Sequence, residues 1–108
     1  MIVLRLLYPA REHLISIAFD DGVRLVEVGD LTSIVRSMPE IPIKTVAPLR
    51  WINRRTFVEV SVARQWARAL QKAQYAQQAK ELSALLDWVD TKTLEGANHR
   101  EARSSWSR

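Results

Sequence analysis

The sequence predicts a small α+β domain in which two β-hairpins pack on helices, in the order β-β-α-β-β-α-α. Two β-prone runs flank Asp21-Gly22, and two more flank residues 53–55. From residue 61 to residue 95 the chain has no glycine or proline, and apolar residues recur every three or four positions. The first two patterns are typical of hairpins and the third is typical of helices.

The first hairpin is predicted from the runs 14–19 and 23–28, on either side of Asp20-Asp21-Gly22. An Asp-Gly pair supplies the positive φ angles that a type I′ turn needs. Residues 2–8 precede this hairpin as a strand or an extended apolar segment. Pro9 ends that segment, because proline cannot donate to a β-ladder.

A short helix is predicted next, from Leu31 to about residue 38. Asp30 is the expected N-cap, since its carboxylate can accept hydrogen bonds from the free N–H groups of the first turn. Leu31, Ile34 and Val35 have the spacing of a buried helix face.

The second hairpin is predicted from the runs 49–52 and 56–60. Asn53 lies between them and tolerates the left-handed conformation of a tight turn.

The helical region from Ser61, its expected N-cap, is predicted to be two helices. One helix over 61–95 would be unusually long for a domain of this size, so we expect a bend near residues 74–79. Gly96 is expected to end the second helix.

The composition favours one folded domain in a reducing compartment. The chain has 108 residues, 47% of them hydrophobic, and no cysteine. We expect a single domain over residues 1–96 and a polar tail over 97–108. The start of the chain lacks the pattern of a signal peptide, and no apolar run approaches the roughly 20 residues of a membrane span. We therefore expect a cytoplasmic protein without a membrane partner.

No pattern of catalytic residues is evident. His13 and His99 lie far apart, and the three glycines form no phosphate-binding loop. The turn explains Asp20-Asp21, while Asp87 and Asp90 lack a companion histidine and read as a solvated helix face. We expect no enzymatic activity, no metal site and no cofactor.

Three of the four tryptophans, Trp51, Trp66 and Trp88, fall where core-facing residues are expected, and we predict that they pack in the core. Trp106 lies in the polar tail. We expect a mobile chain end there, with stacking on a base or docking on a partner as the alternative.

A basic stripe is the strongest functional signal. The net charge is +4, and residues 1–50 hold as many acidic as basic side chains, so the whole excess lies after residue 50. Arg64, Arg68 and Lys72 are four positions apart and share one helix face. Arg54 and Arg55 precede this helix and are expected to extend the same patch. The planar fork of arginine suits phosphate.

Glutamines add hydrogen-bonding capacity to this stripe, above all Gln65 and Gln71, which can bond phosphates or base edges. The alternative is a solvated helix face neutralised by nearby acids. Residues 60–80 contain no acidic side chain, so we favour a binding patch.

Several segments carry a family resemblance. Residues 14–34 run strand, Asp-Asp-Gly, strand, Gly-Asp-Leu and helix; residues 55–60 read Arg-Thr-Phe-Val-Glu-Val; and an Ala79-Lys80 pair leads to Trp88-Val89. Over about residues 14–95 the chain resembles the Bro-type N-terminal domain of phage antirepressors and baculovirus repeated-ORF proteins. It departs from that family at residues 37–40, which read Ser-Met-Pro-Glu, and at residues 71–78, which lack a proline.

The resemblance implies a phage- or plasmid-type regulator that binds nucleic acid, DNA in the first place, in the cytoplasm of a bacterial host. The alternative is a small inhibitor whose basic face meets an acidic surface on a host or phage protein, such as a repressor, a polymerase or a defence complex of the kind that anti-CRISPR proteins block. A homodimer through the helical region 61–95 is compatible with both functions.

Overall fold

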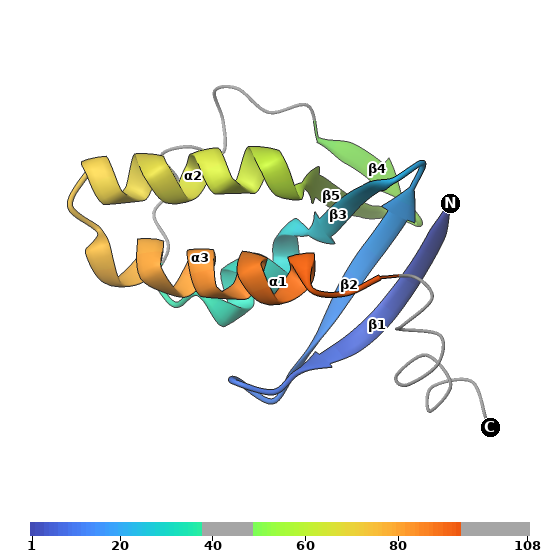
Figure 1. Ribbon diagram of the computed structural model, residues 1–108, viewed down its shortest axis with the longest axis horizontal. Helices are drawn as coiled ribbons and strands as arrows, with labels where there is room; N and C mark the ends of the chain where they lie inside the picture. Colours follow the sequence, from blue (N-terminus) through green and yellow to red (C-terminus); the bar gives the residue numbers. More distant parts are fainter. Residues whose placement is uncertain (38–48, 94–108) are drawn as a thin grey trace.

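The computed structural model describes residues 1–37 and 49–93, which form one antiparallel sheet and three helices. In chain order the elements are β1 (Ile2–Tyr8), β2 (His13–Asp20), β3 (Val23–Glu27), α1 (Val28–Ile34), β4 (Arg50–Ile52), β5 (Arg55–Glu59), α2 (Val60–Lys72) and α3 (Ala76–Asp90). The strands lie side by side in the order β1-β2-β3-β5-β4 (Figure 1). The predicted α+β class is confirmed.

The two predicted hairpins belong to a single sheet. Strand β3 pairs with β5, and Val26 lies opposite Val58 in that pairing. Residues 2–8, predicted to be a strand or an extended segment, pair with β2 along their whole length as β1. The described chain therefore has three strands before its first helix, one more than the predicted order.

Both hairpin turns have the predicted chemistry. Asp21 and Gly22 have φ angles of 51° and 80°, and Asn53 and Arg54 have φ angles of 49° and 65°. Two positive φ angles in a two-residue loop match a type I′ turn, whose twist fits that of the flanking strands. The second loop is shorter than predicted, because Arg55 already pairs with Ile52.

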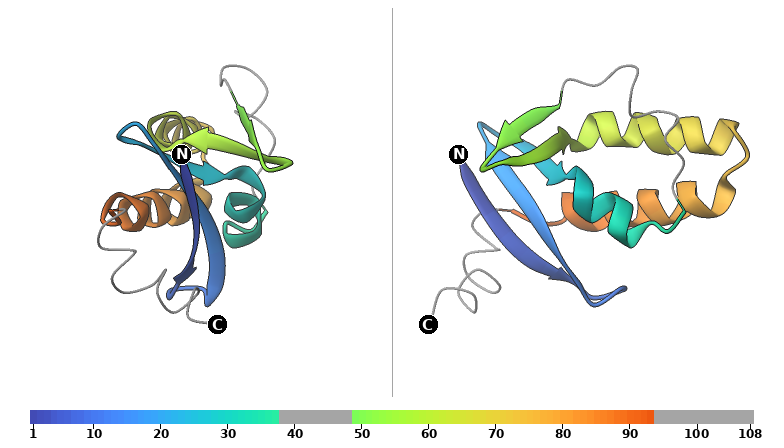
Figure 2. Two further views of the ribbon diagram at one scale, coloured as in Figure 1. Left: turned by 90° about the vertical axis from the view of Figure 1, so that its right-hand side faces the viewer. Right: turned by 180° about the vertical axis from the view of Figure 1, so that it is seen from behind.

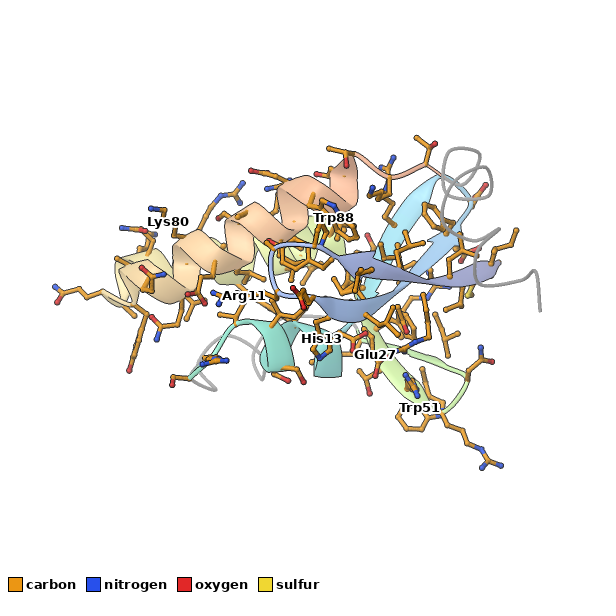
Figure 3. The ribbon with its side chains drawn as sticks, turned by 90° about the horizontal axis from the view of Figure 1, so that it is seen from below. Arg11, His13, Glu27, Trp51, Lys80 and Trp88 are labelled. Atoms are coloured by element: carbon orange, nitrogen blue, oxygen red, sulfur yellow. The ribbon has the colours of Figure 1, made fainter. Side chains whose placement is uncertain are left out.

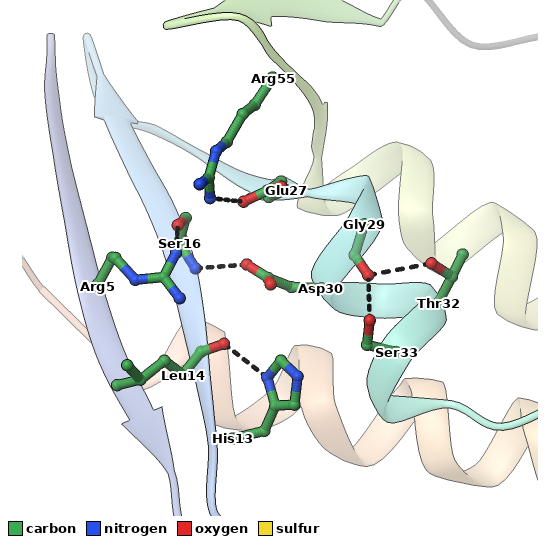
Figure 4. Close-up of polar contacts among 10 residues, drawn as sticks. All are labelled: Arg5, His13, Leu14, Ser16, Glu27, Gly29, Asp30, Thr32, Ser33 and Arg55. Carbon is green, nitrogen blue, oxygen red and sulfur yellow. Dashed lines mark hydrogen bonds and ion pairs between the residues drawn. The ribbon is translucent and has the colours of Figure 1, made fainter.

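Helix α1 begins at Val28, so the prediction that Asp30 caps a helix starting at Leu31 is wrong. Asp30 lies in the first turn, and its buried carboxylate accepts the backbone N–H of Ser16 at 2.8 Å (Figure 4). The ladder between β2 and β3 starts only at Ile17, so Asp30 supplies the acceptor that β3 no longer offers. The helix ends at Ile34, before the predicted end near residue 38.

The predicted break of the long helical region is confirmed. Helix α2 closes with N–H groups of Gln74 and Tyr75 bonded back to the carbonyls of Gln71 and Leu70. This is the hydrogen-bond pattern of a Schellman motif, with Gln74 in the left-handed position at φ 69°. At its other end α2 starts at Val60 after Glu59, so Ser61 is not the N-cap.

The three helices lie together on one side of the sheet (Figures 1 and 2). Their apolar faces and one face of the sheet form the main core, which includes Leu6, Ile17, Leu31, Leu70 and Leu86. The opposite face of the sheet carries a smaller cluster: Ala18, Leu25 and Phe57, with Val3 and Ile52 packed against them. Within residues 1–37 and 49–93, no helix is both long enough and apolar enough to cross a membrane.

Candidate nucleic-acid interface

A groove of about 290 Å³ runs between α2 and α3. Helix α2 lines it with three of the predicted site residues, Arg64, Arg68 and Gln71, and α3 adds Lys80 and Ser83. Ala67 and Ala79, one from each helix and both buried, complete the lining. Their small side chains leave the space that the longer polar residues surround.

Arg64 is not available as a free cation. Its Nη2 atom lies 2.9 Å from Oδ1 of Asp87 and 2.5 Å from Oδ2 of Asp90, and 31% of its side chain is exposed. The hydrogen bond to Asp90, aided by the one to Asp87, raises the pKa of the guanidinium above its usual value. The expectation that the stripe lacks acidic partners therefore fails at Arg64, because both carboxylates come from the neighbouring helix.

Three other cations on these two helices have no such partner; Arg68 and Lys80 line the groove, whereas Lys72 follows Gln71 on α2 outside its lining. Arg68, Lys72 and Lys80 are exposed, and none of them forms an ion pair with a residue that the structure describes. Glu81, the acidic neighbour of Lys80, is bonded instead by Arg11 at 3.0 Å and by Gln77 at 2.8 Å. The far half of the groove is therefore cationic, while the half near Arg64 is neutralised.

Sequence reasoning missed Lys80 and Ser83. The predicted bend near residue 74 could have identified them. Such a bend folds the second helix back antiparallel to the first and so places residues near 80 beside Gln71. Of the two predicted glutamines, Gln71 lines the groove, whereas Gln65 is exposed on α2 outside it.

The predicted patch is split in two. Arg54 and Arg55 belong to the β4–β5 hairpin, whose turn lies at the opposite end of the molecule from the α2–α3 turn (Figures 1 and 2). Arg55 donates to Oε1 of Glu27 at 2.9 Å (Figure 4). Arg54 is exposed and has no ion-pair partner among residues 1–37 and 49–93. These two arginines therefore cannot join Arg68 and Lys72 on one continuous helix face.

The three tryptophans that the structure describes differ sharply in burial. Trp66 is 3% exposed and lies in the core, as predicted. Trp88 is half-buried, with its ring 5.1 Å from that of Tyr8 and Nζ of Lys92 4.7 Å from its centroid. The prediction for Trp51 is wrong, because its side chain is 72% exposed at the edge of the sheet (Figure 3). Trp106 and His99 lie outside the described residues.

Two further titratable side chains, Asp20 and His13, have structural partners. The hydrogen bond from Arg50, at 2.6 Å, lowers the pKa of Asp20, and the ring of His13 lies against the carbonyl of Leu14. Over the described ranges, no three His, Cys, Asp or Glu side chains gather as metal ligands would. The exposed guanidinium of Arg68 and ammonium of Lys80 are donors of the kind that can bond an anion.

Comparisons with models of protein families, with curated protein sequences and with solved structures find no match to this chain.

Proposed function

We propose that this protein binds nucleic acid, DNA in the first place, through the groove between α2 and α3, as an antirepressor-like regulator of phage or plasmid type acting in the bacterial cytoplasm. The observation that carries the proposal is a set of three exposed cations with no acidic partner among residues 1–37 and 49–93: Arg68 and Lys80 in the lining of the groove, and Lys72 one position beyond Gln71 on α2. The regulatory part rests on the resemblance to Bro-type domains alone.

The chemistry of this cluster suits a phosphate backbone. The guanidinium of Arg68 can donate two parallel hydrogen bonds to one phosphate, and the two lysines add positive charge from either helix. Gln71 and Ser83 line the groove beside them and supply neutral donors. Contacts of this kind position a protein on nucleic acid without reading its bases.

An acidic protein surface is the second candidate partner. The specific observation in its favour is Arg64, which binds the carboxylates of Asp87 and Asp90 within the same groove. An inhibitor that docks on a repressor, a polymerase or a defence complex would place its partner's carboxylates on Arg68, Lys72 and Lys80 in the same way. Capture from a host lysate treated with nuclease separates the two candidates, because only a protein partner survives that treatment.

The test is a mobility-shift or anisotropy titration with a DNA duplex at several salt concentrations. Each cation that neutralises a phosphate contributes about 0.9 to the slope of log affinity against log salt. We expect Arg68→Gln, Lys72→Gln and Lys80→Gln each to lower the slope by about that amount and to weaken binding at low salt.

Arg36→Gln is the matched control, since it removes one exposed positive charge outside the groove. We expect it to leave the slope unchanged. Equal losses in all four variants would mean that binding follows net charge alone. Binding that ignores salt, or no binding at low salt, would contradict the proposal.

A further inference from the structure

The β4–β5 hairpin presents an aromatic ring that the fold leaves in water. Trp51 lies on β4, an edge strand of the sheet. Among the described residues it is the most exposed large apolar side chain (Figure 3). Leu49, two positions earlier, is also exposed. An indole ring of this size normally contributes to a core or to an interface.

The backbone that carries this ring is held in place. Trp51 pairs with Thr56 across the hairpin, between the pairs Arg50–Phe57 and Ile52–Arg55. Phe57 and Ile52 belong to the small cluster on the sheet face without helices. Because neighbouring residues of a strand point to opposite faces, packing of Ile52 in that cluster directs Trp51 to the other side.

The same hairpin carries one exposed positive charge that is not neutralised within the described chain. Arg54, in the turn that follows β4, is exposed and forms no ion pair within the described chain. Two carboxylates at the ends of strands β2 and β3 are already engaged by the hairpin's other arginines, Asp20 by Arg50 at 2.6 Å and Glu27 by Arg55 at 2.9 Å. The hairpin therefore offers a flat apolar surface and a free guanidinium a few residues apart.

We propose that the β4–β5 hairpin is a second nucleic-acid site that takes a single strand, with one base stacked on Trp51 and the adjacent phosphate bonded by Arg54. A base can stack on a protein ring only when it is unstacked from its own neighbour, so the site selects a single strand over a duplex. Charge complementarity favours this ligand over an apolar peptide. The inference rests on the proposed function for the class of ligand, but it concerns a different surface.

The test compares a labelled oligothymidylate of about 12 nucleotides with a blunt duplex of the same length. We expect Trp51→Ala to weaken binding of the single strand about tenfold or more, to leave its salt slope unchanged, and to leave duplex binding unchanged. Trp51→Phe keeps an aromatic face and should restore most of the affinity. Arg54→Gln should lower the salt slope for the single strand by about 0.7.

Leu14→Ala, which shortens another exposed apolar side chain on β2, is the control and should change neither affinity. If Trp51→Ala binds the single strand as tightly as the wild type does, the proposal of a hairpin site is wrong. The proposed function would still stand in that case if the groove variants lose duplex binding. If the wild type binds neither probe, both proposals fall. Loss of a nuclease-resistant protein partner in Trp51→Ala, with unchanged oligonucleotide binding, would reassign the hairpin to a protein.

Discussion

Asp30 is an ionisable side chain whose buried position favours the neutral, protonated form of its carboxyl group. It is only 8% exposed, and burial raises the pKa of its carboxyl group, with the N–H of Ser16 acting in the opposite direction and Glu27 adding to the rise. A raised pKa means that the folded state binds the proton more tightly than the unfolded state does. The resulting stabilisation is complete below the unfolded pKa of about 3.9 and is lost as the pH rises through the folded pKa.

We expect Asp30→Asn to remove this pH dependence. The amide oxygen can still accept the Ser16 N–H, so the variant should match or exceed the wild type at neutral pH and lose its advantage as the pH falls. Urea unfolding from pH 4 to pH 8 measures the difference. Asp30→Ala leaves the Ser16 N–H without an acceptor and should cost about 1–3 kcal/mol of unfolding free energy at neutral pH. A wild type that gains on the Asn variant as the pH rises would contradict the assignment.

Between elements, the turn from α2 to α3 determines the shape of the groove. Its Schellman motif places Gln74 in a left-handed conformation, which achiral glycine adopts at little cost and L-residues adopt only with strain. The antiparallel return of α3 then brings Asp87 and Asp90 to Arg64 and brings Lys80 to the cationic half.

Gln74→Gly should therefore stabilise the protein. Relief of the left-handed strain outweighs the extra freedom of glycine in the unfolded chain, and we expect a gain of about 0.5–1 kcal/mol. Thermal unfolding followed by circular dichroism should show a melting temperature a few degrees higher. Gln65→Gly, the same substitution at an exposed position inside α2, should instead cost about 1 kcal/mol. Equal effects of the two substitutions would show that the left-handed conformation of Gln74 carries no strain.

Features that depend on local chemistry were predictable from the sequence. Asp21-Gly22 and Asn53 specify their turns through neighbouring residues alone, and the expected length of a helix predicted the break near residue 74. Pairing between β3 and β5 was not predictable in this way, because no local pattern says which hairpin edges meet.

The candidate site was predicted only in part for the same reason. Periodicity placed Arg64 and Arg68 on one face, but the acids that neutralise Arg64 belong to another helix. Trp51 was predicted to pack in the core, but the position of β4 at the sheet edge, which no local pattern indicates, leaves its ring in water. Local sequence patterns predict helices and strands. Whether a side chain is exposed and unpaired depends on neighbours that are distant in the chain.

At the scale of the whole molecule, the two proposed binding surfaces lie far apart. The molecule measures 43 Å along its longest axis, with the sheet toward one end and the α2–α3 turn at the other (Figure 1). The large apolar residues of α2, such as Trp66 and Leu70, are buried within the chain. The seam for a dimer through the helical region 61–95 is thereby reduced to small apolar residues on α2 and at the start of α3, namely Val62, Ala69, Ala73 and Ala76, of which Ala73 and Ala76 are exposed.

We therefore expect light scattering to give the mass of one chain, 12.4 kDa, at micromolar concentration, because so few apolar atoms remain on that seam. A mass of about twice that value would restore the dimer through the helical region. Ala73→Arg, placed on the seam, should then return the protein to a single chain, and Gln65→Arg would control for the added charge.

The pairing of β3 with β5 also has a consequence for the order of folding. Each hairpin is closed by a two-residue loop and can form early at little entropic cost. Val26 and Val58 meet only after α1 and all the residues between the hairpins have been enclosed in a loop. That closure requires the largest loss of chain entropy before its contacts form, so we infer that it is the slow step in which two independent hairpins become one sheet.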